Sequence, residues 1–226
     1  MDPNDVDRGT PGGSLLRTYE QRRARRETQV RSRHPRIGGA ILALSDEPAT
    51  TVSFRRGADA EVFVAQRLRQ RCGPEVELLF NRRLSARGRD GDIDVLAVAP
   101  SGVHVVDVKR YQAAVRVRRR GGLLRPLRPQ LLIGSRDRTA LLDSLERQRD
   151  VVRALLDRHP DGAAVPLHLA MCFVDADLPL LSNLSFNGYP LLYPKRLAKR
   201  INADGPLAAE GVREVAPELA RRFPSA

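Results

Sequence analysis

Residues 91–111, GDIDVLAVAPSGVHVVDVKRY, constrain the fold more than any other part of this chain. Two apolar stretches within them, residues 93–99 and 103–109, have the length and composition of buried strands. The Pro-Ser-Gly sequence between these stretches is typical of a tight turn. A hairpin sets the beginning of its first strand beside the end of its second strand. We therefore expect two paired antiparallel strands whose outer ends meet.

Charged residues stand at the open end of this expected hairpin. Asp94 begins the first strand, and Asp107 and Lys109 end the second. Because side chains two residues apart in a strand point to the same side, Asp107 and Lys109 share a face, and the hairpin brings Asp94 near Asp107. Charges at the end of an apolar strand need a partner or a ligand. A strand-end ion pair without a catalytic role meets that need, and a metal site is the alternative.

A metal site here has a defined chemistry. Two converging carboxylates suit Mg²⁺, with Mn²⁺ as a second choice, and such a site normally keeps several water ligands. A bound metal lowers the pKa of a water molecule and stabilises charge on phosphoryl oxygens. A lysine beside it can orient that water or offset the charge of a phosphate. The pattern therefore indicates phosphodiester hydrolysis if it is not a plain ion pair.

Three further residues are candidates for the same site. Asp92 shares a face with Asp94, but Asp94 lies further inside the strand and is preferred. Glu61 lies on the apolar face of a helix expected over residues 58–71, so it is an outer or second metal ligand or else an acid stabilised by the helix dipole. Gln148 interrupts the apolar stripe of a helix expected over residues 139–158, either near the lysine or as a buried amide bonded to backbone.

The expected elements alternate in type along the chain. Further helices are expected at residues 14–34, 195–202 and 208–222, and further strands at residues 76–81, 114–118, 167–174 and 189–193. This order predicts an α/β fold with a mixed central sheet flanked by helices, preceded by an N-terminal basic helix. We expect three parts: a disordered tail, a basic helix with its connector, and an α/β domain with a C-terminal helical extension, at residues 1–13, 14–56 and 57–226.

The formal net charge of +12 is concentrated in two segments. Residues 14–36 carry eight Arg and two Glu, and residues 110–138 carry nine Arg and one Asp. Such patches suit a polyanion such as nucleic acid, although a solvated surface is the alternative, because Arg outnumbers Lys 36 to 3, a bias that genomic base composition also produces. An aromatic content of 4% without Trp disfavours base stacking, so backbone contacts are expected. The candidate phosphate-binding residues are Arg110, Arg116, Arg118, Arg119 and Arg120.

The motifs GADAE at residues 57–61, DIDVLAV at 92–98 and PSGVHVVDVKRY at 100–111 occur in an order that resembles the NERD (nuclease-related) domain of the PD-(D/E)XK nuclease-like superfamily. The resemblance covers residues 57–175. It implies a core of the restriction-endonuclease type, with Asp94 and Asp107 as metal ligands and Lys109 as the catalytic lysine. It also matches Glu61 to the helix glutamate of the family and Gln148 to the polar helix residue of related nucleases.

The function expected from these features is Mg²⁺-dependent cleavage of nucleic acid, DNA rather than RNA. Two alternatives stay open: a non-catalytic nucleic-acid-binding module with a vestigial site, and a scaffold that docks a partner or a second copy through residues 14–36. No apolar stretch reaches the roughly 18–20 residues of a membrane span, and the acidic N-terminus is unlike a secretory signal. A cytoplasmic protein without a membrane partner is therefore expected.

Overall fold

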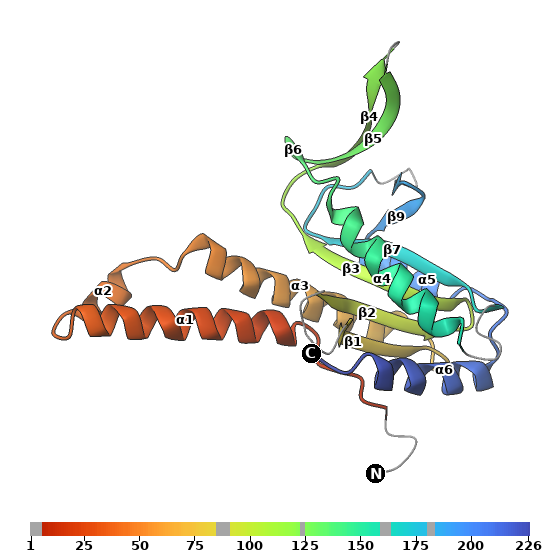
Figure 1. Cartoon of the computed structure of the whole chain (residues 1–226), viewed down its shortest axis with the longest axis horizontal. Helices are drawn as coiled ribbons and strands as arrows, with labels where there is room; N and C mark the ends of the chain where they lie inside the picture. The colour runs from red at the N-terminus through yellow and green to blue at the C-terminus, as the bar shows by residue number, and fades with distance from the viewer. Residues whose placement is uncertain (1–5, 85–90, 123–124, 159–163, 180–183) are drawn as a thin grey trace.

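The computed structural model describes residues 6–84, 91–122, 125–158, 164–179 and 184–226. Its helices are α1 (Gly13–Arg33), α2 (Gly38–Leu44), α3 (Ala49–Arg71), α4 (Leu141–Leu156), α5 (Pro194–Ile201) and α6 (Ala209–Arg222). Its strands are β1 (Glu77–Arg83), β2 (Asp92–Ala99), β3 (Gly102–Arg110), β4 (Val115–Gly122), β5 (Arg125–Ile133), β6 (Arg136–Asp137), β7 (Leu167–Val174), β8 (Ser185–Phe186) and β9 (Tyr189–Leu192). Figure 1 shows these elements in three parts: a core around the sheet, a helical projection and a strand hairpin.

The core contains a mixed six-stranded sheet in the order β1-β2-β3-β7-β9-β8. Strand β2 runs antiparallel to both β1 and β3, and β3, β7 and β9 run parallel to one another. The expected hairpin pairs Val95 with Val106 and closes at Ala99 and Gly102. The predicted α/β fold with a mixed sheet flanked by helices, of the restriction-endonuclease-like type, is confirmed.

Each face of the sheet packs against a different pair of helices. Val106 and Val108 lie in the cluster formed with α3 and α5, whereas Val103 and Val105 lie in the cluster formed with α4 and α6. This alternation follows from the period of two in a strand. Burying a large aliphatic side chain contributes about 1.5–3 kcal/mol, so the two clusters together dominate the stability of the core.

The first helical part differs from the expected connector. Residues 38–44 form α2, and α3 begins at Ala49 rather than near residue 58. The expected domain boundary at Gly57 therefore falls inside a helix. A Cβ at Gly57 would lie 2.8 Å from the side chain of Leu15, so this glycine permits close packing of α1 on α3. We call residues 13–56 the arm, which projects from the core in Figure 1.

The N-terminal tail also differs where it is described. Residues 1–5 lie outside the described residues, but residues 6–12, which we call the strap, pack on the core. The backbone N–H of Phe80 donates a hydrogen bond of 2.8 Å to the carbonyl of Arg8, and Val6 packs against the core cluster. A Cβ at Gly9 would lie 2.1 Å from the carbonyl oxygen of Phe80. Glycine, which composition alone associates with disorder, here allows a close approach to a strand.

The strand expected at residues 114–118 is β4, but it belongs to a separate three-stranded sheet in the order β4-β5-β6. Strand β5 was not expected from the sequence, because Pro129 cannot donate a hydrogen bond within a sheet. In Figure 1 the β4–β5 hairpin extends beyond the end of β3 that carries the candidate site.

Candidate active site

The open end of the β2–β3 hairpin brings Asp94, Asp107 and Lys109 together. Asp94 and Asp107 each stand one residue beyond the paired Val95 and Val106. Asp94 Oδ2 accepts a hydrogen bond of 2.6 Å from the backbone N–H of Val108, and Lys109 Nζ donates to Asp107 Oδ1 at 2.7 Å. Asp107 is buried, and its second oxygen, Oδ2, has no hydrogen-bond partner among the described residues. The sequence prediction that these three residues converge agrees with the geometry.

The two carboxylates repel each other in a poorly solvated position. Burial, followed by the negative charge of Asp107, raises the pKa of Asp94 to about 7. Burial alone would lower the pKa of Lys109, but the charges of Asp107 and Asp94 outweigh this effect and raise it. The lysine therefore remains positively charged, and the surplus negative charge beside it favours a bound cation.

Glu61 reaches the same site from α3. Its side chain is buried, and Oε2 accepts a hydrogen bond of 3.0 Å from the backbone N–H of Gly12. Burial, followed by the charge of Asp94, raises the pKa of Glu61 to about 9. Glu61 lies in the middle of α3, far from its N-terminus at Ala49, so the alternative of an acid stabilised by the helix dipole is wrong.

The hydrogen bond to Glu61 comes from the strap, which the sequence did not connect with the site. Gly12 has a φ of 71°, and a Cβ there would lie 2.9 Å from Cα of Ala58. Only glycine combines that backbone conformation with such a close approach. The adjacent Gly12-Gly13 pair directly before a helix was the available signal, but it is equally typical of a linker.

A buried arginine of β1, which the sequence did not reveal, binds both the strap and the end of α6. Arg82 is fully buried, and its guanidinium donates to the carbonyls of Phe223 and Ala220, each at 2.6 Å, and of Asp7 at 2.8 Å. These bonds attach the C-terminal end of α6 and the strap to the strand beside β2. Arg82 stands between Asn81 and Arg83, so the sequence gives no indication that it is buried against backbone carbonyls.

Gln148 is buried against the beginning of β2. Its Nε2 donates to the carbonyl of Asp92 at 3.2 Å, and its Oε1 has no partner among the described residues. No hydrogen bond joins it to Lys109 in the described part of the chain. The alternative of a buried amide bonded to backbone therefore agrees with the structure.

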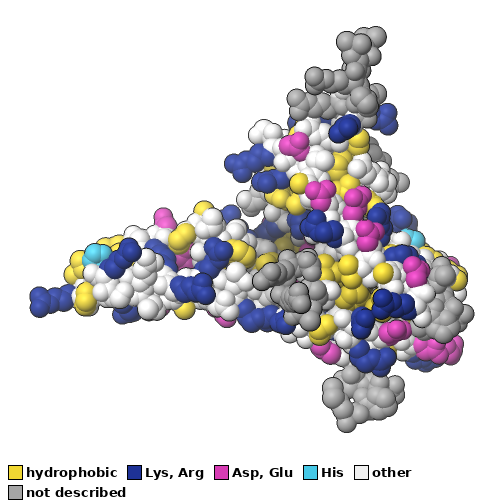
Figure 2. All heavy atoms as spheres, viewed as in Figure 1, with side chains coloured by type: hydrophobic (Ala, Val, Ile, Leu, Met, Phe, Trp, Pro, Cys, Tyr) yellow, Lys and Arg dark blue, Asp and Glu magenta, His cyan; other side chains and the backbone are white. Residues whose placement is uncertain are grey.

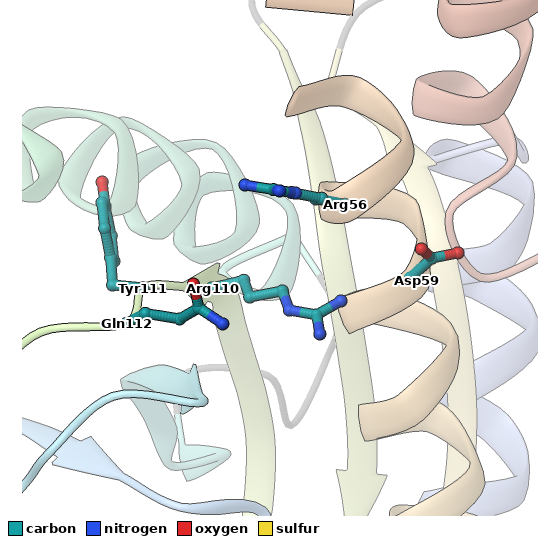
Figure 3. A pocket seen from close by; sticks show the side chains of 5 residues that line it. All are labelled: Arg56, Asp59, Arg110, Tyr111 and Gln112. Carbon is teal, nitrogen blue, oxygen red and sulfur yellow. The ribbon is translucent and has the colours of Figure 1, made fainter. Parts of the chain in front are cut away.

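Two adjoining cavities open beside these residues. One, of about 540 Å³, is lined by Glu61, Asp92, Asp94 and Lys109 together with residues of α1, α3 and β3. The other, of about 520 Å³, lies between α3 and the end of β3 (Figure 3). Both are lined by Arg56, Arg110 and Tyr111, so they form one depression, which we call the site groove.

The five candidate phosphate-binding arginines divide between two places. Arg110 lines the site groove, and its Nε donates to Asp175 Oδ2 at 2.7 Å. Arg116, Arg118 and Arg119 are exposed on β4 and are not among the described residues that line the groove. The side chain of Arg120 lies outside the described residues. The hairpin thus provides a basic surface beyond the groove rather than part of its wall.

The carboxylates do not form a closed metal cage. Among the described residues, no group of three or more His, Cys, Asp or Glu side chains is placed to hold a metal ion, so Glu61, Asp94 and Asp107 do not form one three-ligand set. The carboxylates of Asp94 and Asp107 remain, the latter with its unpartnered Oδ2, and Mg²⁺ accepts such a donor set when water and substrate complete its coordination.

The family comparison agrees with this arrangement. The family model of the nuclease-related domain, NERD, matches residues 56–174. The chain belongs to the NERD family. The match covers more than half of the chain, includes all the residues of the β2–β3 site, and confirms the resemblance seen in the sequence; the PD-(D/E)XK superfamily is the general context of NERD domains. Neither the curated proteins nor the solved structures contain a match.

The NERD match leaves most of the arm and the C-terminal helices α5 and α6 outside its range. The family assignment supports a nuclease-related function and an interaction with nucleic acid at a coarse level. Across the described residues, no helix has both the length and the apolar character required to cross a membrane.

Proposed function

We propose that this NERD domain hydrolyses phosphodiester bonds of nucleic acid with the help of Mg²⁺, and that DNA is preferred to RNA. The observation that carries the proposal is the convergence of Asp94, Asp107 and Lys109 beside an open groove. A plain ion pair needs only one carboxylate. Burial and the neighbouring negative charges oppose ionisation of Asp94 and Glu61, and a bound cation would favour their charged forms.

Asp94 and the unpartnered Oδ2 of Asp107 would hold the metal directly. Glu61, with one oxygen bonded to Gly12, would contribute through a water molecule. Mn²⁺ could replace Mg²⁺, because both accept carboxylate and water ligands. When bound, the metal supplies an activated water and neutralises charge on the phosphoryl oxygens.

The protein's own contribution centres on Lys109. Its side chain is 25% exposed, and its Nζ is held by Asp107 at the edge of the groove. In this position a charged ammonium can donate to a non-bridging phosphate oxygen or orient the attacking water. Such preorganised charge is worth about 10²–10³-fold in rate. Gln148 supports the site indirectly, through its bond to the β2 backbone at Asp92.

The proposal is tested by incubating the purified protein with single- and double-stranded DNA and RNA in Mg²⁺, in Mn²⁺ and in EDTA. Cleavage is expected with either metal, faster on DNA, and none in EDTA. Asp107→Asn keeps the shape of the side chain and removes its charge, so it should abolish cleavage. Cleavage that continues in EDTA or in Asp107→Asn would refute the assignment.

A non-catalytic nucleic-acid-binding module is the second candidate. The 2.7 Å pair between Lys109 and Asp107 and the lack of a three-ligand metal group among the described residues favour it. It predicts binding whose logarithm falls linearly with the logarithm of the salt concentration, without cleavage in any metal. The same incubations separate the two functions.

A further inference from the structure

The site groove continues beyond the carboxylates to a pair of arginines on opposite walls. Arg56 belongs to α3, at the base of the arm, and Arg110 ends β3. Figure 3 shows the Arg56 side chain reaching from the helix towards Tyr111, while the guanidinium of Arg110 extends towards the helix. Two segments far apart in sequence thus direct positive charge into one depression.

Both guanidinium groups have unused donors. Arg56 is exposed and makes no hydrogen bond or ion pair with any described residue. Arg110 uses Nε for Asp175, and its two terminal nitrogens have no hydrogen bond within the described part of the chain. Asp59 also lines this end of the groove, so two positive charges face one carboxylate. The local surplus is positive, in contrast to the carboxylate end.

The carboxylate end and the arginine end of the site groove lie next to each other, so one bound strand could contact both. Lys109 lines the groove at the carboxylate end, and Arg110 is the next residue of the same strand. A nucleic-acid strand that follows the groove from a phosphate at Lys109 would bring its next phosphate to Arg56 and Arg110. A guanidinium presents several donors in a plane that matches phosphate oxygens, so it suits this role better than an ammonium.

We propose that Arg56 and Arg110 bind the phosphate next to the scissile one, so that α3 forms one wall of the substrate cleft. The inference rests on the proposed function and adds a residue, Arg56, that lies outside the sequence-predicted set. The base of the arm would therefore contact nucleic acid. The Arg–phosphate contacts carry no base sequence, and they position the backbone relative to Lys109.

The test compares Arg56→Ala with Arg67→Ala. Both residues are exposed arginines of α3, but Arg67 lies away from the groove and over the Phe63 ring, 5.1 Å from its centroid. Binding of a fluorescent DNA oligonucleotide is measured in EDTA by anisotropy over a range of salt concentrations, and cleavage is measured separately in Mg²⁺. We expect Arg56→Ala to weaken binding about tenfold and to lower the salt slope by about 1, with Arg67→Ala close to the wild type.

A second measurement locates the contact. A neutral methylphosphonate is placed at each phosphate in turn around the cleavage position. The wild type should lose affinity when the phosphate next to the scissile one is neutral, and Arg56→Ala should be insensitive at that position alone. Equal effects of Arg56→Ala and Arg67→Ala, or unchanged positional sensitivity, would overturn the inference while cleavage by the wild type preserved the proposed function. Absence of both binding and cleavage in the wild type would overturn both.

Discussion

The core and the arm contain helices of similar length that are held in different ways. Within the core, the second half of α3 buries Val64, Ala65 and Leu68 against the sheet. Helix α1 of the arm, by contrast, buries only Gly13 and Tyr19 among its residues. An apolar stripe holds α3 against the sheet, whereas α1 has no such stripe.

The arm is held by polar and cation–π contacts instead. The Tyr19 hydroxyl donates to Glu47 at 3.0 Å, Arg22 lies over the Phe54 ring at 4.6 Å from its centroid, and Arg26 donates to Ser45 Oγ at 2.7 Å. The exposed Arg22 and Arg26 contacts contribute about 0–1 kcal/mol each. Figure 2 shows basic side chains along the length of the arm. The core is therefore held by buried apolar surface, whereas the arm is held mainly by contacts of charged and polar side chains.

The largest expected difference in stability is between two leucine truncations, one in the core and one in the arm. Leu145 of α4 is fully buried, and Leu44 of the arm is 89% exposed. Leu145→Ala should lower the free energy of unfolding by about 2–5 kcal/mol, because it opens a cavity, whereas Leu44→Ala should change it by less than about 0.5 kcal/mol. Urea unfolding measures both. Similar losses in the two variants would contradict the division between core and arm.

The next largest loss of stability is expected from substitution of Arg82, the buried arginine of β1. Arg82→Met keeps the volume but leaves the carbonyls of Phe223 and Ala220 without their donors, which should cost about 2–4 kcal/mol. The neighbouring Arg83 is exposed, so Arg83→Met should be almost neutral. Thermal unfolding of the two variants compares them directly. Equal melting temperatures would show that attachment of the chain ends contributes nothing to the core.

A pH dependence of stability is expected from His104 in the core. Burial, followed by the charges of His168 and Arg200, lowers its pKa from 6.5 to about 3. The unfolded chain therefore takes up a proton below pH 6.5 that the folded protein excludes, so stability falls as pH falls from 6.5 to 3. The slope from this residue is about 1.4 kcal/mol per pH unit. Urea unfolding across this range should show a shallower slope for His104→Gln, and an unchanged slope would refute the assignment.

The smallest effect is expected in the arm. Tyr19→Phe removes only the hydrogen bond to Glu47, which should cost about 0.5–1.5 kcal/mol. Because the arm has little buried surface, this loss should accelerate amide hydrogen exchange in α1 and α2 without changing exchange in β3. Faster exchange throughout the core would show that arm and core unfold as one unit.

The sequence predicted those parts of the fold whose pattern is local. The apolar stretches of β2 and β3, the apolar stripe of α4 and the turn at residues 100–102 are short-range patterns, and each corresponds to an observed element. The convergence of Asp94, Asp107 and Lys109 followed from the hairpin alone. The inward direction of Glu61 followed from helical periodicity, which places it on the apolar face of α3.

The features that were missed depend on contacts between distant segments. The strap looked like a disordered tail because glycine and proline are typical of both linkers and close backbone contacts. Gly12 meets Glu61, and Arg82 meets Phe223, across separations that no local pattern encodes. Arg56 was counted with a connector because Pro48 suggested a break, whereas α3 begins directly after it.

The role of Lys109 in catalysis is tested by single-turnover cleavage of DNA in Mg²⁺, comparing Lys109→Ala with Lys195→Ala. Lys195 is an exposed lysine of α5 and provides the matched loss of charge. We expect Lys109→Ala to remain folded and bound to DNA but to cleave at least about 10²-fold more slowly, while Lys195→Ala cleaves like the wild type. Equal cleavage rates in the two variants would show that the lysine at the end of β3 has no part in the chemistry.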